Sequence, residues 1–164
     1  MKLQYHVVIS LCVSALVWVV FRSFTAAAAC FATGVFLDID HLIDYAINYG
    51  GRIRIRHLFK AFEYEAFENI FVFLHSWEFV VIYLALLWLV DWQPVAIGAG
   101  IGLLVHLLLD HFFNDHSRLA YFLSYRMLHG FSGKHFYGAA EYRKRLKRKR
   151  AAGGAETAAK DKTI

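Results

Sequence analysis

Long apolar stretches alternate with short polar ones along this chain of 164 residues. Four apolar segments stand out, over residues 6–21, 24–37, 69–90 and 95–113. Because a helix needs about 20 mostly apolar residues to cross the hydrocarbon core of a bilayer, the third and fourth segments are long enough. The first two are shorter and are joined only by Arg22 and Ser23, so they form either two tilted crossings or a re-entrant helical pair. The pattern predicts an all-α fold, a polytopic membrane helix bundle with about four membrane helices.

The composition supports the membrane prediction. Hydrophobic residues make up 59% of the chain, and its mean hydropathy is +0.42. A soluble domain of this size could not bury so many apolar side chains in one core, whereas lipid can cover those that remain exposed. We therefore expect an integral membrane protein, with membrane lipid as its first partner.

The net charge of +5 comes from a local basic tail. Seven of its side chains are Arg143, Lys144, Arg145, Lys147, Arg148, Lys149 and Arg150. Without these seven charges the chain would be net negative. We interpret the tail as a cytoplasmic topology signal, and binding to anionic lipid headgroups is a compatible second role. No aromatic-rich recognition module accompanies it, so we expect no nucleic acid partner.

The charges between the segments agree with four crossings and a cytoplasmic tail. The connection over residues 42–68 then also faces the cytoplasm, and it contains Arg52, Arg54, Arg56 and Lys60. The opposite connection, 91–94, has no Lys or Arg, and only Arg22 lies on the unfavoured side. This distribution follows the positive-inside rule. We expect a membrane-embedded domain over residues 1–140, with an interfacial helix at 118–128, and a basic, disordered cytoplasmic tail over 141–164.

Two further features concern the membrane helices themselves. The run of residues 26–30, AAAAC, weakly resembles a lipoprotein cleavage site, but Arg22 interrupts the preceding apolar run and another apolar helix follows. We therefore favour a retained membrane helix over a cleaved signal peptide. Gly98 and Gly102 have the G-x-x-x-G spacing that allows membrane helices to approach closely.

Three clusters of potential metal ligands lie near the ends of the segments. They contain Asp38, Asp40 and His41; His75 and Glu78; and His106 and Asp110. Spacings of three and four residues place the members of each pair on one helix face. With four crossings all three clusters lie at the same membrane face, and carboxylates there are costly unless they are paired or bind metal.

This convergence predicts a metal site. A mixed set of imidazoles and carboxylates suits Zn²⁺, Mn²⁺ or Fe²⁺ better than Ca²⁺, and the number of ligands allows one ion or two. The alternative for His106 and Asp110 is an ion pair between helices. A lone intramembrane histidine such as His6 is interpreted as a hydrogen-bonded packing residue rather than a ligand. Other polar residues are assigned to supporting or interfacial positions: His57, His111, Asn114, Asp115, His116, His129 and His135.

The clusters resemble the membrane-bound metal-dependent hydrolase family of bacterial and archaeal inner membranes. The resemblance rests on a D-x-D-H element at residues 38–41, an H-S element at 75–76 and an H-x-x-x-D element at 106–110. It covers roughly residues 25–116, with Leu37 in place of a frequent proline and no His-Arg pair before His75. The family is distantly similar to zinc-dependent phospholipase C, which implies hydrolysis of a phosphoester by metal-activated water.

On this hypothesis the metal ligands are Asp38, Asp40, His41, His75, His106 and Asp110. Glu78 orients the water or acts as the base, Asp40 takes part in catalysis, and Arg52, Arg54 and Arg56 receive the phosphate or only set the topology. Two other functions stay open at this point. One is non-enzymatic metal binding or transport, and the other is an adaptor that recruits partners through its basic tail.

Overall fold

The computed structural model describes residues 3–50, 57–58, 61, 67–114 and 116–161. Over these residues the secondary structure is helical, with no strand and one isolated bridge between Asn69 and Ser132. The elements are α1 (Leu3–Phe21), α2 (Phe24–Phe36), η1 (Leu37–Asp40), α3 (His41–Tyr49), α5 (Trp77–Leu89), α6 (Pro94–Phe113), η2 (Arg118–Tyr121), α7 (Leu123–Leu128), α8 (Gly133–Tyr137) and α9 (Ala139–Asp161). The expected all-α class is confirmed for the described part of the chain.

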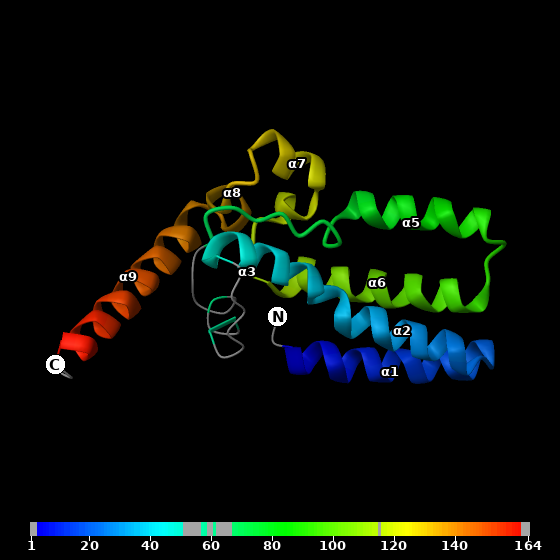
Figure 1. The fold of residues 1–164 in the computed structure, drawn as a ribbon. Coiled ribbons are helices and arrows are strands. Elements are labelled where there is room, and N and C mark those ends of the chain that lie inside the picture. Colours follow the sequence, from blue (N-terminus) through cyan, green and yellow to red (C-terminus); the bar gives the residue numbers. More distant parts are fainter. Residues whose placement is uncertain (1–2, 51–56, 59–60, 62–66, 115, 162–164) are drawn as a thin grey trace. The chain divides into compact units, whose positions relative to one another are not determined.

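The chain divides into two compact units. The first, here called the bundle unit, comprises Met1–His41, Val72–Asn114 and Tyr121–Leu123, and the second comprises Leu42–Phe71, Asp115–Ala120 and Ser124–Ile164. In the bundle unit α1, α2, α5 and α6 lie side by side (Figure 1), and α2 contacts both α1 and α6. All residues of the candidate site described below belong to this unit.

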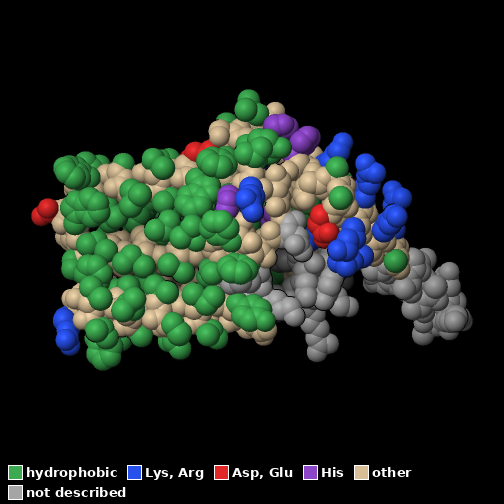
Figure 2. Space-filling view, turned by 180° about the vertical axis from the view of Figure 1, so that it is seen from behind, with side chains coloured by type: hydrophobic (Ala, Val, Ile, Leu, Met, Phe, Trp, Pro, Cys, Tyr) green, Lys and Arg blue, Asp and Glu red, His purple; other side chains and the backbone are tan. Residues whose placement is uncertain are grey.

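Three helical stretches are long and apolar enough to cross a membrane, namely Gln4–Phe21, Phe24–Tyr49 and Pro94–Phe113. Only 22% of the first stretch is buried within the protein. Large hydrophobic side chains such as Leu16, Trp18 and Val20 point outward, and hydrophobic side chains cover most of the bundle face seen in Figure 2. A surface of this kind is compatible with contact with lipid.

The segment predicted to be the longest crossing contains an apolar helix of only 13 residues. Over 69–90 we expected a continuous helix, but α5 begins only at Trp77 and has 13 residues. Ser76 is its N-cap, with the hydroxyl accepting a hydrogen bond from the backbone N–H of Phe79 at 3.2 Å. Before it, the N–H of Leu74 donates to Asp40 Oδ2 at 2.9 Å. The carboxylate of Asp40 thus accepts a hydrogen bond from a backbone N–H in a stretch that hydropathy alone assigns to a helix.

The first two segments are longer than their apolar runs indicated. The turn between them is tight because Arg22 has φ +50° and the hydroxyl of Ser23 caps α2 by accepting from the N–H of Ala26. At the other end α2 continues through the 3₁₀ turn η1 into α3, so the helical stretch reaches Tyr49. The connection expected from Leu42 onward therefore begins as helix.

Two periodic series of residues bring α2 and α6 together. Gly98, Gly102, His106 and Asp110 recur every four residues on α6, and Ala26, Cys30, Gly34 and Asp38 recur every four residues along α2 and η1. A Cβ atom at Gly98 would overlap the carbonyl of Ala26, and one at Gly102 would overlap that of Cys30. The two helices run parallel in this register, which confirms the close approach that G-x-x-x-G predicted.

In the second unit, α9 continues to Asp161 where we expected a disordered tail. Its sequence is rich in Ala, Lys, Arg and Glu, which are strong helix formers. Glu141 also pairs with Lys144 at 3.4 Å and with Arg145 at 3.1 Å, one turn further along the helix. Lys and Arg side chains gather over α9 in Figure 2. The interfacial helix expected at 118–128 is divided into η2 and α7.

We predict that Gly98→Ala and Gly102→Ala each destabilise the detergent-solubilised protein by about 1–3 kcal/mol, because each added methyl group meets the backbone of α2. Resistance to unfolding by increasing SDS measures the effect. Val95→Ile is the matched control, since it adds one methylene group at a 47% exposed position of the same helix. Equal stability of the glycine variants and the control would contradict the close packing.

Candidate metal centre

Four side chains from three parts of the bundle unit converge on one point. They are Asp38, His75, His106 and Asp110, here called the four-ligand cluster, and one ligand atom of each lies within 4.8 Å of the others. His75 Nε2 is 3.1 Å from Asp38 Oδ1, 3.2 Å from His106 Nε2 and 3.5 Å from Asp110 Oδ2. His106 Nε2 is 3.4 Å from Asp38 Oδ1 and 3.5 Å from Asp110 Oδ2.

Local structure explains how each ligand reaches the cluster. Asp38 lies in the 3₁₀ turn that follows α2, and His75 lies one residue before the N-cap of α5. His106 and Asp110 are one turn apart on α6, so both face the same neighbour. Under the cluster, Tyr121 donates its hydroxyl to the carbonyl of Asp110 at 2.7 Å. Backbone and core packing therefore hold the cluster in place.

The outer ring nitrogens of both histidines have fixed acceptors. His106 Nδ1 lies 2.9 Å from the carbonyl oxygen of Gly34, and because a carbonyl only accepts, Nδ1 carries the proton. His75 Nδ1 likewise donates to a carboxylate, since it lies 3.2 Å from Asp40 Oδ2. In each neutral ring the Nε2 lone pair then points into the cluster, which is the arrangement seen around metal-bound histidines.

Burial makes the cluster costly unless its charges are compensated. The side chains of His106, His75 and Asp110 are 0%, 3% and 5% exposed, whereas that of Asp38 is 34% exposed. Removing unpaired carboxylates from water costs several kcal/mol, and either a cation or protonated imidazoles must offset it. Burial lowers the pKa of His75, but hydrogen bonds to Asp38 and Asp40 outweigh this effect and raise that pKa to about 10.

The geometry fits a tetrahedral metal ion. Ligands that bind such an ion at about 2.0–2.1 Å are separated from one another by about 3.3 Å. The five nitrogen–oxygen and nitrogen–nitrogen separations of the cluster span 3.1–3.5 Å. With both rings neutral, two inward-facing lone pairs and two carboxylates form an acceptor-rich set that suits a cation. The four-ligand cluster could therefore hold a metal ion.

The two other predicted ligands, Asp40 and His41, form a second group with His75, again within 4.8 Å. The His41 and His75 rings are 4.7 Å apart, and His41 Nε2 is 3.6 Å from Asp38 Oδ1. The structure thus brings all six predicted ligands together, but not as one equivalent set. Asp40 contacts the outer nitrogen of His75, so it orients that ring rather than joining the four-ligand cluster.

Glu78, predicted to act as base, belongs to neither group of potential ligands. It lies in the first turn of α5, and its Oε2 accepts a hydrogen bond from the N–H of Leu123 at 2.8 Å. This contact ties the start of α5 to the bundle. Arg52, Arg54 and Arg56, assigned to phosphate binding, lie outside the described residues, and so does Asp115.

The residues expected in supporting or interfacial positions also lie outside both groups. His111 Nδ1 accepts a hydrogen bond from the indole N–H of Trp77 at 3.4 Å, and Asn114 donates its amide to the hydroxyl of Tyr121 at 3.2 Å. The described histidines of the second unit, His57, His116, His129 and His135, contact aromatic rings there.

The sequence interpretation assigned His6 to hydrogen-bonded packing and did not connect it to the site. This residue is 1% exposed, its Nε2 lies 3.1 Å from Asp110 Oδ1, and its ring stacks on that of His106 at 4.2 Å. A signal was present, because His6, Ser10 and Ser14 recur every four residues in an otherwise apolar segment, and all three are buried. Such a stripe indicates a polar face turned toward neighbouring helices.

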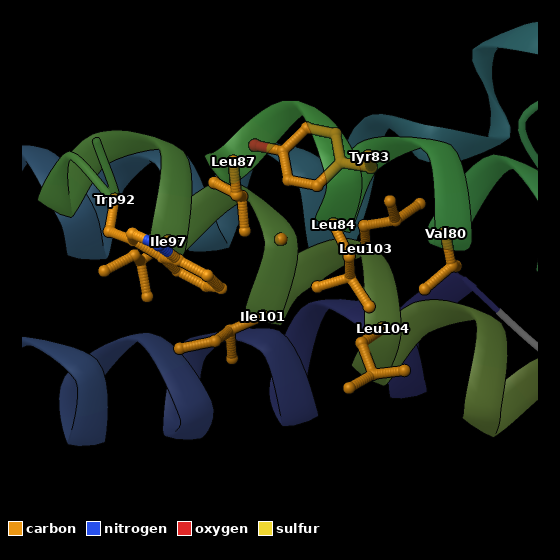
Figure 3. A pocket seen from close by; sticks show the side chains of 10 residues that line it. Val80, Tyr83, Leu84, Leu87, Trp92, Ile97, Ile101, Leu103 and Leu104 are labelled. Atoms are coloured by element: carbon orange, nitrogen blue, oxygen red, sulfur yellow. The ribbon is translucent and has the colours of Figure 1, made fainter. Parts of the chain in front are cut away.

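A separate cavity of about 150 Å³ lies between α5 and α6 (Figure 3). Its walls include Val80, Leu87 and Leu103, and the hydroxyl of Tyr83 is already engaged by the carbonyl of Ala96 at 2.8 Å. The lining of this cavity is apolar, and none of the potential metal ligands belongs to it.

Searches against protein-family models, curated proteins and solved structures found no match for this chain. The functional argument therefore rests on the geometry of the site.

We predict that the protein purified in detergent retains about one divalent metal ion per chain and that the double variant His106→Ala, Asp110→Ala does not. Elemental analysis after removal of loosely bound metal measures the content. His116→Ala is the control, since His116 lies in the second unit and in neither ligand group. Metal-free wild-type protein after reconstitution with Zn²⁺, Mn²⁺ and Fe²⁺ would instead favour imidazolium–carboxylate pairing.

Proposed function

We propose that this protein is a membrane-bound metal-dependent hydrolase that cleaves a phosphoester of a lipid or a lipid-linked substrate. The observation that carries the proposal is the four-ligand cluster, which places two imidazole Nε2 atoms and two carboxylates at tetrahedral spacing in an apolar bundle. The D-x-D-H, H-S and H-x-x-x-D elements add the resemblance to the membrane-bound hydrolase family.

Zn²⁺ is the ion that we propose, because its ligand distances and tetrahedral preference match the cluster and imidazole with carboxylate suits it. Such an ion lowers the pKa of a bound water to about 7 and polarises a phosphoryl oxygen. Asp38, His75, His106 and Asp110 would hold it. Asp40 keeps the His75 ring in the tautomer that presents Nε2. The partly exposed Asp38 marks the side from which water and substrate reach the site.

The position of the site in a membrane protein supports a lipid substrate. We propose that α5 is the fourth membrane helix, because it is apolar, packs beside α6 and exposes Val81, Trp88 and Leu89. The positive-inside pattern supports a prokaryotic inner membrane with the site and the C-terminus toward the cytoplasm. The basic residues of α9 are suited to anionic headgroups.

Non-enzymatic metal binding is the second candidate, and the number of ligands favours it. Structural zinc sites are filled by four protein ligands, whereas catalytic sites keep one position for water. The four-ligand cluster alone would fill a tetrahedral shell. Hydrolysis then requires either a fifth position or release of Asp38, the most exposed ligand. Activity measurements decide between the two functions.

We predict metal-dependent release of phosphorylated headgroups when wild-type protein is reconstituted into vesicles of mixed phospholipids. Chelation should abolish the release, and Zn²⁺ should restore it. His106→Ala should lower the rate at least about 100-fold, since it removes a ligand of the ion that activates the water. His129→Ala, a histidine of the second unit, should match wild type. If loaded wild-type protein releases nothing from lipid or soluble phosphoesters, the non-enzymatic candidate is preferred.

We also predict that Glu78→Gln lowers the hydrolysis rate by about 10²–10⁴-fold while the metal content stays unchanged, because the amide cannot accept a proton as a general base. The amide oxygen can still accept the hydrogen bond from the N–H of Leu123, so the start of α5 stays in place. Unchanged activity would assign Glu78 a purely structural role and leave the base to be found elsewhere.

A further inference from the structure

The N-terminal helix α1 contributes one imidazole to the immediate surroundings of the four-ligand cluster. His6 Nε2 lies 3.1 Å from Asp110 Oδ1, the oxygen of that carboxylate that is turned away from His75 and His106. The same ring stacks on His106 with centroids 4.2 Å apart and an interplanar angle of 23°. One side chain of α1 therefore contacts two of the four candidate ligands.

The contact between His6 and Asp110 indicates which nitrogen of His6 carries the proton when Asp110 is ionised. An ionised carboxylate has no proton to offer, so an approach of 3.1 Å is favourable only with the proton on His6 Nε2. This contact restrains rotation of the carboxylate about its Cβ–Cγ bond. With Oδ1 held by His6, Oδ2 stays within 3.5 Å of both His75 Nε2 and His106 Nε2. The orientation of one ligand thus depends on a residue outside the cluster.

From this geometry we infer that His6 is a positioning residue for the metal ligand Asp110, so that α1 completes the metal site. The inference rests on the metal site of the proposed function and not on hydrolysis. Outer partners of this kind orient metal ligands, and their loss typically costs 10–100-fold in metal affinity.

The burial of His6 supports the inference. Most of α1 faces outward, as Tyr5 at 52% and Val8 at 59% exposure show, whereas His6 is 1% exposed. An imidazole buried without a hydrogen bond costs more than an apolar side chain of similar size. The contact of Nε2 with Asp110 offsets part of that cost, and a side chain needed only for packing would not require it.

The experiment compares three substitutions at one position. His6→Gln keeps an N–H donor that can reach Asp110, His6→Phe keeps an aromatic ring that can stack on His106 but has no donor, and His6→Ala keeps neither. Val8→Ala is the control on the exposed side of the same helix. Zn²⁺ affinity is measured by competition with a chromogenic chelator in detergent, and the melting temperature is measured without metal.

We expect His6→Ala and His6→Phe to weaken Zn²⁺ binding by about 10–100-fold and His6→Gln to recover most of that loss. Val8→Ala should bind as wild type. Restoration by Phe instead of Gln would overturn the inference, because it would show that the ring acts through packing. Equal Zn²⁺ affinity of all variants and wild type would also overturn the positioning role of His6, but it would not contradict the metal site itself. A wild-type protein that binds no Zn²⁺ would contradict both the site and the role of His6.

Discussion

The close contact between α2 and α6 is the constraint on which the rest of the bundle unit depends. Without side chains at Gly98 and Gly102, the backbones of the two parallel helices meet at the carbonyls of Ala26 and Cys30. The same four-residue period continues one turn further, where the carbonyl of Gly34 accepts from His106 Nδ1. Packing and hydrogen bonding therefore set one register, and that register decides which polar side chains share the end of the bundle.

A consequence of this register is that the polar cluster forms where the helices are already held together by apolar packing. Leu37, Leu103 and Leu107 are buried beside the cluster and belong to one hydrophobic core with Val80 and Tyr121. Close packing limits how far neighbouring side chains can shift. Such a support holds the candidate ligands in the way that a preorganised site requires.

The negative charges of the cluster can be compensated in two ways. Imidazolium groups can pair with Asp38, Asp40 and Asp110, or a metal ion can take the place of the inward protons. Both solutions offset the cost of burying carboxylates in an apolar bundle. They differ in the Nε2 atoms of His75 and His106, which lie 3.2 Å apart. Two protonated nitrogens repel each other at that distance, whereas a shared cation attracts both lone pairs.

The sequence by itself determined the class of protein and most of the candidate ligands. Hydropathy indicated apolar helices because lipid selects for composition, and the spacing of His106 and Asp110 placed them on one face because helical periodicity is local. The length of the apolar run over 69–90 predicted a continuous helix. In its first part, backbone N–H groups instead donate to the carboxylates of Asp40 and Asp44, and the helix begins only later. The helix over 139–161 replaces the disorder expected there, because Ala, Lys and Arg are strong helix formers even in a highly charged segment.

Only the tertiary structure decided the roles of the ligands within the site. Asp40 could not be separated from Asp38 by spacing, because a 3₁₀ turn directs one carboxylate to Nδ1 of His75 and the other to Nε2. His6 could not be connected to Asp110 either, since 104 positions of chain separate them and a contact between helices leaves no local pattern. Periodicity in the sequence identifies which residues share one face of a helix. Only the packing of the folded protein determines which face of another helix they contact.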